Sequence, residues 1–353
     1  MNLIKSQYLD FFGKKVLFVF PSSIVGGHEL MAIDIIKDLI ELNIDVSVCF
    51  EPTNDRILEI LEKIIIKDNI KKLPLKKRRL ESLSAFFDPL YVSILENFLN
   101  QEKRNNYNSV ILVQGDIEIG SPYLVAAKKQ KIEIISYIPF THKKSKMNKP
   151  LYFIRDKMDS ILYKYSHTYI TIYNEAAKDL KKFNPISNIY IIKNKVRDLS
   201  KFKILRNNKS DSEKLLFYII GRIEFLQKGH DRLVSIVAEL DLNTLNQFEL
   251  HIIGDGPDLP KLKANLSKIH GLNCYFYGWM KEPWLQAYDA DLLIIPSRFE
   301  GVPLVMLEAL ELEVPIIASK IDGMVDYLEE NSLFSDTNDF KEKILLYLRN
   351  VKD

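Results

Sequence analysis

Short apolar runs that alternate with longer stretches of helical periodicity constrain the fold of this chain more than any other feature. The runs are rich in Val, Ile and Phe, and most are four to seven residues long. Near-continuous apolar runs of this kind are typical of strands buried on both faces of a sheet. The helical segments between them, such as 34–42, favour parallel pairing through crossover connections. The runs lie at 16–20, 46–50, 109–115, 133–139, 168–173, 189–194, 215–221, 248–254, 274–278, 291–297, 315–319 and 332–335.

The runs form two series, which predicts an α/β protein with two Rossmann-like domains facing each other across a cleft. The length of 353 residues agrees with two domains, since roughly 150 residues per domain is usual. The polar stretch 199–214 has no apolar periodicity, so we place one domain at 1–200 and the other at 201–353. The pattern leaves open whether the last helix packs back on the first domain. Clefts between domains are favoured sites for small ligands.

Composition narrows the class of protein. Hydrophobic residues make up 47% of the chain and charged residues 27%, which is typical of a globular protein and excludes a disordered one. Cys49 and Cys274 lie far apart in apolar segments, so no disulfide framework is expected and a reducing compartment fits. No apolar run reaches the roughly 18 residues of a transmembrane helix, and the N-terminus lacks the apolar core of a signal peptide. We therefore expect a cytoplasmic protein.

Charge is distributed unevenly along the chain. With histidine neutral, residues 1–200 carry a net charge of +8 and residues 201–353 a net charge of −6. Two basic runs, 71–79 and 143–146, contribute to the first value, and an amphipathic apolar stretch at 83–98 follows the first run. Basic residues beside apolar ones can hold a protein on anionic lipid, which predicts peripheral attachment to the inner face of a membrane. A solvated loop beside a core helix would show the same pattern. No nucleic-acid-binding motif is present.

The segment 296–310 carries the clearest ligand-binding pattern. A buried strand ends there, a loop with Gly301 follows, and a helix is expected from Pro303, because proline suits the first helical position. Gly301 lets the backbone approach a ligand closely. The free N–H groups of Leu304 and Val305 at the helix start favour an anion such as a phosphate.

Two glutamates flank this turn. Glu300 lies in the loop and Glu308 within the expected helix. Carboxylates at the two ends of a phosphate-binding turn can accept hydrogen bonds from sugar hydroxyls on either side. An ordinary strand–turn–helix with solvated glutamates would have the same sequence pattern, so both interpretations stay open on these residues alone.

Two further strand ends carry polar or glycine-rich turns. Arg222 directly follows the run 215–221, and Lys228 comes before the next helical segment. A guanidinium group and an ammonium group at the carboxyl end of a strand can hold a diphosphate. Two surface cations with no role in binding would give the same sequence pattern. Gly254 and Gly256 form a tight turn after the following strand.

Taken in order, these motifs resemble family 4 of the glycosyltransferases, which are retaining enzymes of the two-Rossmann GT-B fold. The most specific part is the Glu-x7-Glu spacing of Glu300 and Glu308. The other residues that carry the resemblance are Gly221, Arg222, Lys228, Gly229, Gly254, Asp255, Gly256, Pro257, Ala290, Asp291, Pro296, Ser297, Gly301 and Ala309. The first half matches through Gly26, Gly27, His28 and Glu29, without the Gly-x-Gly-x-x-Gly of a dinucleotide dehydrogenase.

The resemblance implies roles for several of these residues. Arg222 and Lys228 would bind the donor diphosphate and stabilise it as leaving group, Glu300 would contact the donor sugar, and Glu308 would bind the ribose. Many family members have glycine where this chain has Pro303, so the phosphate cradle loses one N–H donor. The further donor contacts that the resemblance implies are Gly26, Gly27, Gly254, Met280, Gly301, Val302, Leu304 and Val305, with Trp279 and Met280 beside the base.

Some polar residues have two interpretations. His142 follows the strand at 133–139, where the family often has a histidine facing the reacting sugar, and a surface histidine in a basic loop is the alternative. Asp289 and Asp291 have the spacing of a metal-binding pair but lead into a buried strand, so neither a metal nor another cofactor is expected. Asp116 and Glu118 would cap a helix or face the acceptor, and capping is favoured.

The sequence thus predicts a retaining glycosyltransferase. It would move a sugar from a nucleotide-diphosphate sugar to a hydroxyl of a glycan or lipid-linked acceptor, in cell-surface polysaccharide synthesis. By resemblance, the second domain binds the donor, the first binds the acceptor, and the acceptor attacks from the front face. A non-catalytic sugar-nucleotide-binding subunit, or an epimerase or phosphorylase on the same fold, stays open. The sequence does not specify the base, sugar, acceptor, linkage or oligomeric state.

Overall fold

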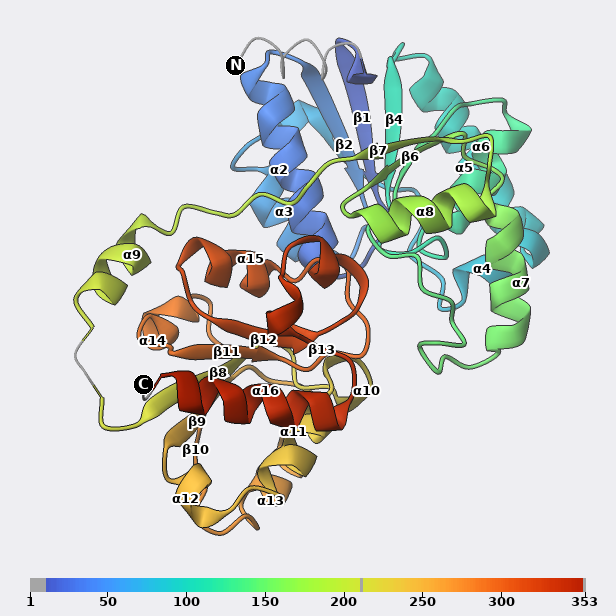
Figure 1. Cartoon of the computed structure of the whole chain (residues 1–353). Helices are drawn as coiled ribbons and strands as arrows, with labels where there is room; N and C mark the ends of the chain where they lie inside the picture. The colour runs from blue at the N-terminus through green and yellow to red at the C-terminus, as the bar shows by residue number, and fades with distance from the viewer. Residues whose placement is uncertain (1–10, 210–211, 352–353) are drawn as a thin grey trace. The chain divides into compact units, whose positions relative to one another are not determined.

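The computed structural model describes residues 11–209 and 212–351, and the chain divides into two compact units after Lys195 (Figure 1). The division lies before the boundary that we expected at residue 200. The polar stretch 199–214 contains helix α9 (Ser200–Asn207), which belongs to the C-terminal unit. Arg206 of α9 donates hydrogen bonds to the carbonyl oxygens of Tyr288 at 3.2 Å and Ala290 at 2.7 Å. These bonds anchor the helix on the C-terminal unit.

The N-terminal unit is built on a parallel sheet of seven described strands in the order β3-β2-β1-β4-β5-β6-β7 (Figure 1). The strands are β1 (Lys15–Phe20), β2 (Asp45–Phe50), β3 (Ile70–Lys72), β4 (Ser109–Val113), β5 (Ile135–Tyr137), β6 (Thr168–Thr171) and β7 (Asn188–Ile191). The α-helices are α2 (Gly27–Glu41), α3 (Asp55–Leu61), α4 (Glu81–Phe87), α5 (Pro89–Lys103), α6 (Ser121–Lys129), α7 (Tyr152–Leu162) and α8 (Asn174–Phe183).

The C-terminal unit repeats this plan with six described strands in the order β10-β9-β8-β11-β12-β13. The strands are β8 (Leu215–Ile220), β9 (Phe248–Ile253), β10 (Asn273–Gly278), β11 (Leu292–Ile295), β12 (Ile316–Ser319) and β13 (Leu333–Phe334). After α9, the α-helices are α10 (Phe225–Lys228), α11 (His230–Val237), α12 (Leu242–Leu245), α13 (Leu259–Leu266), α14 (Trp284–Ala287), α15 (Leu304–Glu311) and α16 (Thr337–Asn350).

Every apolar run that the sequence analysis assigned to a strand contains one, and all the pairings are parallel. The two-unit α/β fold class is therefore confirmed. Strand β3 was not predicted, because its sequence, Ile-Lys-Lys, is polar and its two lysines are exposed. It is a short edge strand held by backbone pairing with β2 rather than by burial.

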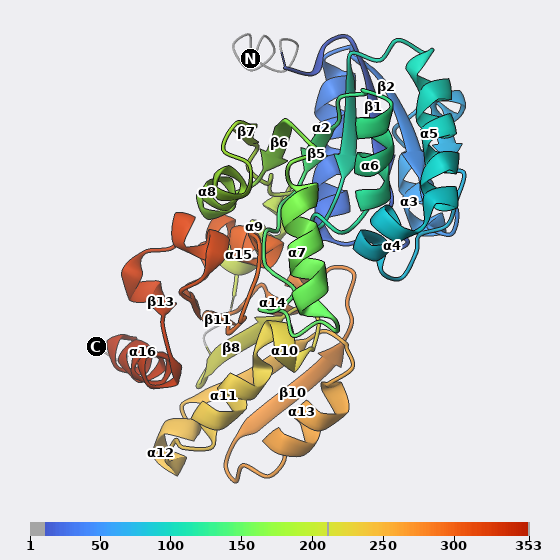
Figure 2. The ribbon, with the colours of Figure 1, turned by 90° about the vertical axis from the view of Figure 1, so that its right-hand side faces the viewer.

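Alternating side chains of each sheet supply the two faces of its core. In β1, Leu17 and Val19 join one apolar cluster with helices α4, α5 and α6. In the C-terminal unit, β8 and β9 share a cluster with α11, α13 and α16, all three of which are labelled in the lower part of Figure 2. The sequence left open whether α16 packs on the first domain, but its buried residues Phe340, Ile344 and Leu348 lie in the core of its own unit.

Candidate functional site

Strands β8 and β11 are neighbours in the C-terminal sheet, and the strand order reverses between them. Their connections leave toward opposite sides, which opens a crevice at the carboxyl ends where open α/β sheets bind ligands. Arg222 follows β8, and Ser297 and Glu300 follow β11. The topology therefore brings the two sharpest sequence motifs to one edge of the same sheet.

Glu300 and Lys228 meet at this switch point. The Lys228 ammonium group donates to the Glu300 carboxylate, which also accepts a hydrogen bond from the Ser297 hydroxyl at 3.0 Å. Glu300 is only 7% exposed, and its backbone N–H donates to the Asp322 carboxylate at 2.8 Å. The pair is thus held in place by its loop. An ammonium group has three donors, so Lys228 can bind Glu300 and an anionic ligand together.

The turns after β8 and β9 pack backbone against backbone. Gly254 has a φ of 151°, and a Cβ atom added there would lie 1.8 Å from the carbonyl oxygen of Gly221. A Cβ atom on Gly256 would lie 2.2 Å from the carbonyl oxygen of Ile223. Any side chain at either position would push the two turns apart. These glycines therefore let the turn after β9 pack directly on the turn after β8. Their lack of side chains also leaves room for a ligand beside the two turns.

A pocket opens beside these turns, lined by residues that follow β8, β9 and β10. Trp279 is 64% exposed on its wall, with Met280 and the exposed cation Arg222 around the same pocket. A large exposed aromatic ring offers a stacking surface to a planar ligand. The structure thus brings Arg222, Gly254 and Met280 together, as the sequence analysis expected for the donor site.

The loop after β11, which contains Gly301, leads into α15, but the helix begins one residue later than predicted. Pro303 is the N-cap residue, with an extended ψ of 126°, and Leu304 is the first helical residue. Leu304 and Val305 lie in the first turn, where N–H groups have no carbonyl partner within the helix. Val302 is buried, so its side chain packs inward. Only backbone groups of this turn are left to contact an anion.

Glu308 lies on α15 and is bound by two residues that the sequence analysis did not single out. Its Oε1 accepts a hydrogen bond from Arg197 Nε at 2.6 Å, and its Oε2 accepts one from Trp284 Nε1 at 2.7 Å. Arg197 lies near the start of the C-terminal unit, and Trp284 is the first residue of α14. No local pattern in the sequence links these residues to Glu308.

The N-terminal sheet has a switch point of its own between β1 and β4. Gly26 N–H donates to the buried Glu29 carboxylate at 2.8 Å, and His28 Nε2 lies 2.6 Å from the same carboxylate. Burial acts to raise the pKa of Glu29, but the contacts with His28 and Gly26 bring it below its ordinary value. A Cβ atom on Gly115 would lie 2.8 Å from the His28 ring, so the ring covers the end of β4. The sequence analysis quoted His28 without giving it a role.

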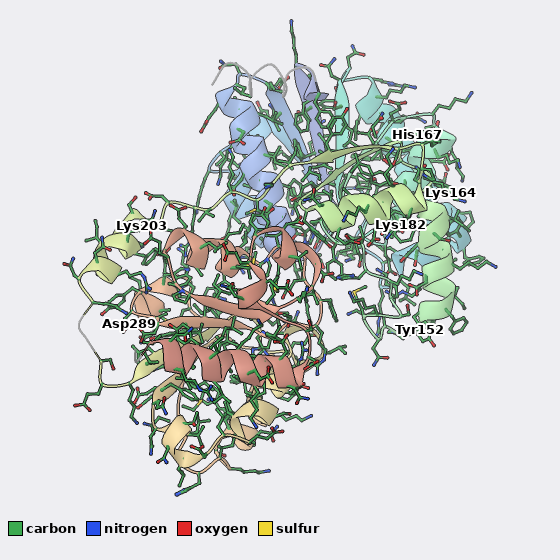
Figure 3. All side chains as sticks on the ribbon, in the orientation of Figure 1. Tyr152, Lys164, His167, Lys182, Lys203 and Asp289 are labelled. Atoms are coloured by element: carbon green, nitrogen blue, oxygen red, sulfur yellow. The ribbon has the colours of Figure 1, made fainter. Side chains whose placement is uncertain are left out.

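His142 lies in the loop after β5 and is half-buried rather than fully exposed. Its ring packs edge-to-face on Phe140 at 4.5 Å, and its Nδ1 lies 3.4 Å from Lys146 Nζ. It lines a pocket with Asp159 and with Tyr152, which Figure 3 labels at the start of α7. His142, Gly26 and Gly27 belong to the N-terminal unit, whereas the other predicted site residues belong to the C-terminal unit.

Lys144 is buried, so the basic run 143–146 does not present all of its charged side chains to a membrane or to solvent. This side chain is 1% exposed, and its Nζ lies 2.6 Å from Asp116, 3.4 Å from Glu118 and 3.7 Å from Asp159. Arg155 also binds Glu118. Asp116 caps a turn, by accepting the N–H groups of Glu118 and Ile119, and not the helix that the sequence analysis expected, because the N-cap residue of α6 is Gly120. The same carboxylate also belongs to a buried ionic cluster that the sequence analysis did not foresee.

The basic run 71–79 is partly paired as well. Lys71 binds Glu102 at 3.0 Å, and Arg78 binds Asp88 at 3.2 Å. The following apolar stretch, 83–98, lies mostly in the core of the N-terminal unit, through residues such as Tyr91 and Leu95. The core-helix interpretation therefore accounts for most of this stretch, although Phe87 and Leu90 remain exposed.

The aspartate pair Asp289 and Asp291 stabilises the amino end of β11 instead of facing the crevice. Asp291 accepts hydrogen bonds from the Leu216 N–H at 2.8 Å and from Lys209 at 2.7 Å, and Asp289 accepts one from the Tyr218 hydroxyl at 3.2 Å. Over residues 11–209 and 212–351, no group of three or more His, Cys, Asp or Glu side chains is arranged to hold a metal ion.

Comparison with known proteins agrees with this architecture. Residues 200–353 match the family model of glycosyl transferases group 1. Over 134 residues, the chain is 30% identical to an uncharacterized 41.2 kDa protein in the cps region of Klebsiella pneumoniae, covering 37% of this chain and 35% of that protein. Over 110 residues, it is 34% identical to the lipopolysaccharide 1,6-galactosyltransferase of Salmonella typhimurium, covering 30% of each. The matches thus span about a third of these relatives.

Solved structures extend the likeness to nearly the whole chain. The apo form of the lipopolysaccharide outer core galactosyltransferase WaaB has a TM-score of 0.73 at 20% identity, covering 96% of this chain and 91% of that chain. Anabaena HepE in complex with UDP has a TM-score of 0.71 at 16% identity, with the same coverage. At these identities the likeness shows a shared fold.

Proposed function

Residues 200–353 form a domain of the glycosyl transferases group 1 family, and from this premise we propose that the protein transfers a sugar from a nucleotide-diphosphate sugar to a hydroxyl group. One observation carries the proposal. Lys228 and Glu300 meet at the β8/β11 switch point, next to a pocket with an exposed tryptophan and Arg222. Such a donor requires three features: cations that bind its diphosphate, a carboxylate that accepts hydrogen bonds from its sugar hydroxyls, and an aromatic surface on which its base can stack.

Each part of the donor has a matching group in the C-terminal unit. Trp279 would stack on the base, and Glu308 would accept hydrogen bonds from the ribose. Arg222, Lys228 and the first N–H groups of α15 would hold the diphosphate, since a helix start favours an anion. HepE was solved with UDP and with UDP-glucose, and two relatives are named galactosyltransferases. We therefore take UDP-galactose and UDP-glucose as the first donors to test.

The chemistry would rest on electrostatic stabilisation of the leaving group. The bond between the anomeric carbon and the diphosphate breaks, and positive groups at Arg222 and Lys228 balance the developing charge on the phosphate oxygen. The acceptor hydroxyl attacks from the same face and passes its proton to that oxygen, which retains the anomeric configuration. Glu300 already accepts hydrogen bonds from Lys228 and Ser297, which suits a group that orients sugar hydroxyls rather than a nucleophile.

The same groups would make the reaction independent of a metal ion. Arg222, Lys228 and the helix N–H groups would supply the positive charge that a divalent cation brings to other transferases. We expect full turnover in excess EDTA. Complete loss of activity there, restored by Mn²⁺ or Mg²⁺, would contradict this part of the proposal.

We further propose that the acceptor is a glycan or a lipid-linked sugar made at the inner face of a membrane. Relatives named for lipopolysaccharide and O-antigen synthesis support this class of acceptor. Within the part of the chain that the structure describes, no helix is long and apolar enough to cross a membrane. We propose that attachment is through the surface of the N-terminal unit, which carries basic residues and the exposed side chains of Phe87 and Leu90.

A two-step experiment tests the function. A panel of nucleotide sugars is first screened by thermal shift, and each donor that binds is then incubated with the protein while release of nucleoside diphosphate is followed. We expect a stabilising shift with at least one donor, slow hydrolysis without acceptor, and an α-linked product by NMR if the donor is α-linked. Binding without turnover on any acceptor would indicate a non-catalytic subunit, and isomerised donor without transfer would indicate an epimerase.

A further inference from the structure

Three separate elements of the C-terminal unit converge on the Glu308 carboxylate. Arg197, just after the junction of the units, donates from Nε to one oxygen at 2.6 Å. Trp284, at the start of α14, donates from its indole N–H to the other oxygen at 2.7 Å. Glu308 itself projects from the second turn of α15. The carboxylate is thus held by one charged donor and one neutral donor, each on its own oxygen.

Both donors are themselves fixed. Trp284 is completely buried, so its ring has no room to turn, and its N–H needs an acceptor there. Arg197 also donates from Nη1 to Glu282 at 3.0 Å, and Lys201 binds the other oxygen of Glu282. A guanidinium group that spans two carboxylates has its plane fixed by them. The network therefore orients Glu308 more tightly than its own flexible side chain would allow.

A carboxylate offers about four lone-pair positions, of which Arg197 and Trp284 use two. One position remains on each oxygen. Two acceptor positions on neighbouring oxygens match a pair of adjacent hydroxyl groups, such as the 2′ and 3′ hydroxyls of ribose. A glutamate side chain that is free to rotate would accept a hydrogen bond from one hydroxyl as readily as from two. It would therefore distinguish ribose from 2′-deoxyribose less well.

We propose that Arg197 and Trp284 are positioning residues that aim Glu308 at both ribose hydroxyls and thereby set a preference for ribonucleotide over 2′-deoxyribonucleotide donors. The proposal rests on the proposed function, because it takes the nucleotide of the donor as the ligand of Glu308. It adds two residues to the donor site that lie 111 and 24 positions away from Glu308 in the sequence.

The test measures the ribose preference of matched variants. Dissociation constants of UDP and dUDP are determined by calorimetry. The same is done for GDP and dGDP, ADP and dADP, and CDP and dCDP. The variants are Arg197→Ala and Trp284→Phe, which removes the indole N–H but keeps an aromatic ring. Lys203→Ala is the control, because Lys203 on α9, labelled in Figure 3, pairs with Glu311 of α15 without touching Glu308.

We expect the unmodified protein to bind the ribose form about tenfold more tightly, since a hydrogen bond to a carboxylate is lost with the 2′ hydroxyl. This ratio should fall at least threefold in Arg197→Ala and Trp284→Phe, and stay unchanged in Lys203→Ala. An unchanged ratio in Arg197→Ala would overturn the inference, even if both nucleotides bind more weakly, because a merely structural role weakens both alike. If Trp284→Phe fails to fold, the result for Arg197→Ala alone decides whether the inference stands.

The outcomes also separate this inference from the proposed function. If no ribonucleoside diphosphate binds the unmodified protein, the proposed donor is wrong and the inference falls with it. If the unmodified protein binds UDP and transfers sugar while all variants keep its ribose preference, the function stands and only the positioning role of Arg197 and Trp284 is overturned.

Discussion

At the scale of single residues, the partly buried contact between Lys228 and Glu300 is the feature on which catalysis would depend. The carboxylate is held by Ser297 and by its own backbone contact with Asp322, so its place does not depend on Lys228 alone. Lys228 in turn has donors left for a phosphate. The two side chains can therefore be tested separately and together.

We expect Glu300→Gln and Lys228→Met each to lower kcat by roughly a hundredfold, because losing one transition-state contact costs about 3 kcal/mol. The double variant removes both charges, so no buried charge is left unpaired and the fold should survive. Steady-state kinetics and circular dichroism on the same samples check this. Glu330→Gln, which breaks the exposed pair with Lys320, is the control. Near-normal turnover in either single variant would remove that residue from the site.

At the scale of elements, a buried ionic cluster ties the loop after β5 to the turn after β4 and to α7. Lys144 of the loop faces Asp116, Glu118 and Asp159, and Arg155 of α7 binds Glu118. Removing one partner from a buried cluster leaves uncompensated charge, whereas a solvated cation can be removed at little cost. The folded N-terminal unit therefore depends on every partner of the cluster being present.

Lys144→Met should lower the free energy of unfolding by about 3–5 kcal/mol, because three carboxylates lose their shared cation. The neighbouring exposed residue supplies a matched control, and Lys143→Met should change stability by less than about 0.5 kcal/mol. Urea unfolding of both variants at neutral pH measures the difference. Equal stabilities would mean that Lys144 is solvated, as a basic run ordinarily is.

Asp159 makes the same cluster sensitive to pH. Burial raises the pKa of Asp159 to about 7, although Lys144 lies 3.7 Å away and acts to lower it. Its unfolded pKa is about 3.9, so the folded chain holds this proton more tightly and loses stability as pH rises from about 4 to 7. Asp159→Asn carries no such cost. Its stability relative to the unmodified protein should therefore grow by about 3 kcal/mol between pH 5 and pH 8.

Comparing the variant with the unmodified protein at each pH cancels the contribution of groups that do not interact with Asp159. Glu81 is one such group, and burial raises its pKa to about 8. Denaturant unfolding at pH 5 and at pH 8 gives the four free energies that are needed. A stability difference that is constant with pH would show that Asp159 titrates normally.

At the scale of the whole molecule, the net charge of +8 over residues 1–200 favours an anionic surface, even though part of it is paired internally. We expect the protein to sediment with phosphatidylglycerol vesicles, and Lys76→Gln, Arg78→Gln and Arg79→Gln together to weaken binding. Each exposed cation near anionic lipid contributes about 1 kcal/mol. Lys77 is left in place because it lies 3.8 Å from the buried Glu81.

The control for this measurement replaces Lys261, Lys263 and Lys268 with Gln. These exposed lysines lie on and just after α13, in the half of the chain with net charge −6. Attraction to lipid is screened over roughly 8 Å at physiological salt, so binding should also decrease as salt rises. Equal binding of the two triple variants would show that the run at 71–79 has no special part in membrane attachment.

The sequence alone determined the sheets and the order of the chemical motifs. Apolar periodicity is a local property, so runs such as 16–20 and 291–297 identified their strands without any knowledge of their neighbours. The Arg222, Lys228 and Glu300 motifs follow such strands, and parallel strands end at one sheet edge. Their meeting was therefore predictable. Strand β3 was not, because its polar residues are held by backbone pairing with β2.

Only the tertiary structure decided which charged residues are buried and which partners they have. Lys144 looks like a solvated lysine in its own sequence, yet its closest carboxylate, Asp116, comes from a turn 28 residues earlier. Arg197 lies 111 residues from Glu308, and no periodicity relates the two. Periodicity records whether a residue faces a core, whereas an ion pair depends on which loops the strand order brings together. That is why the fold could be read from the sequence, while the groups that hold Glu308 and Lys144 could not.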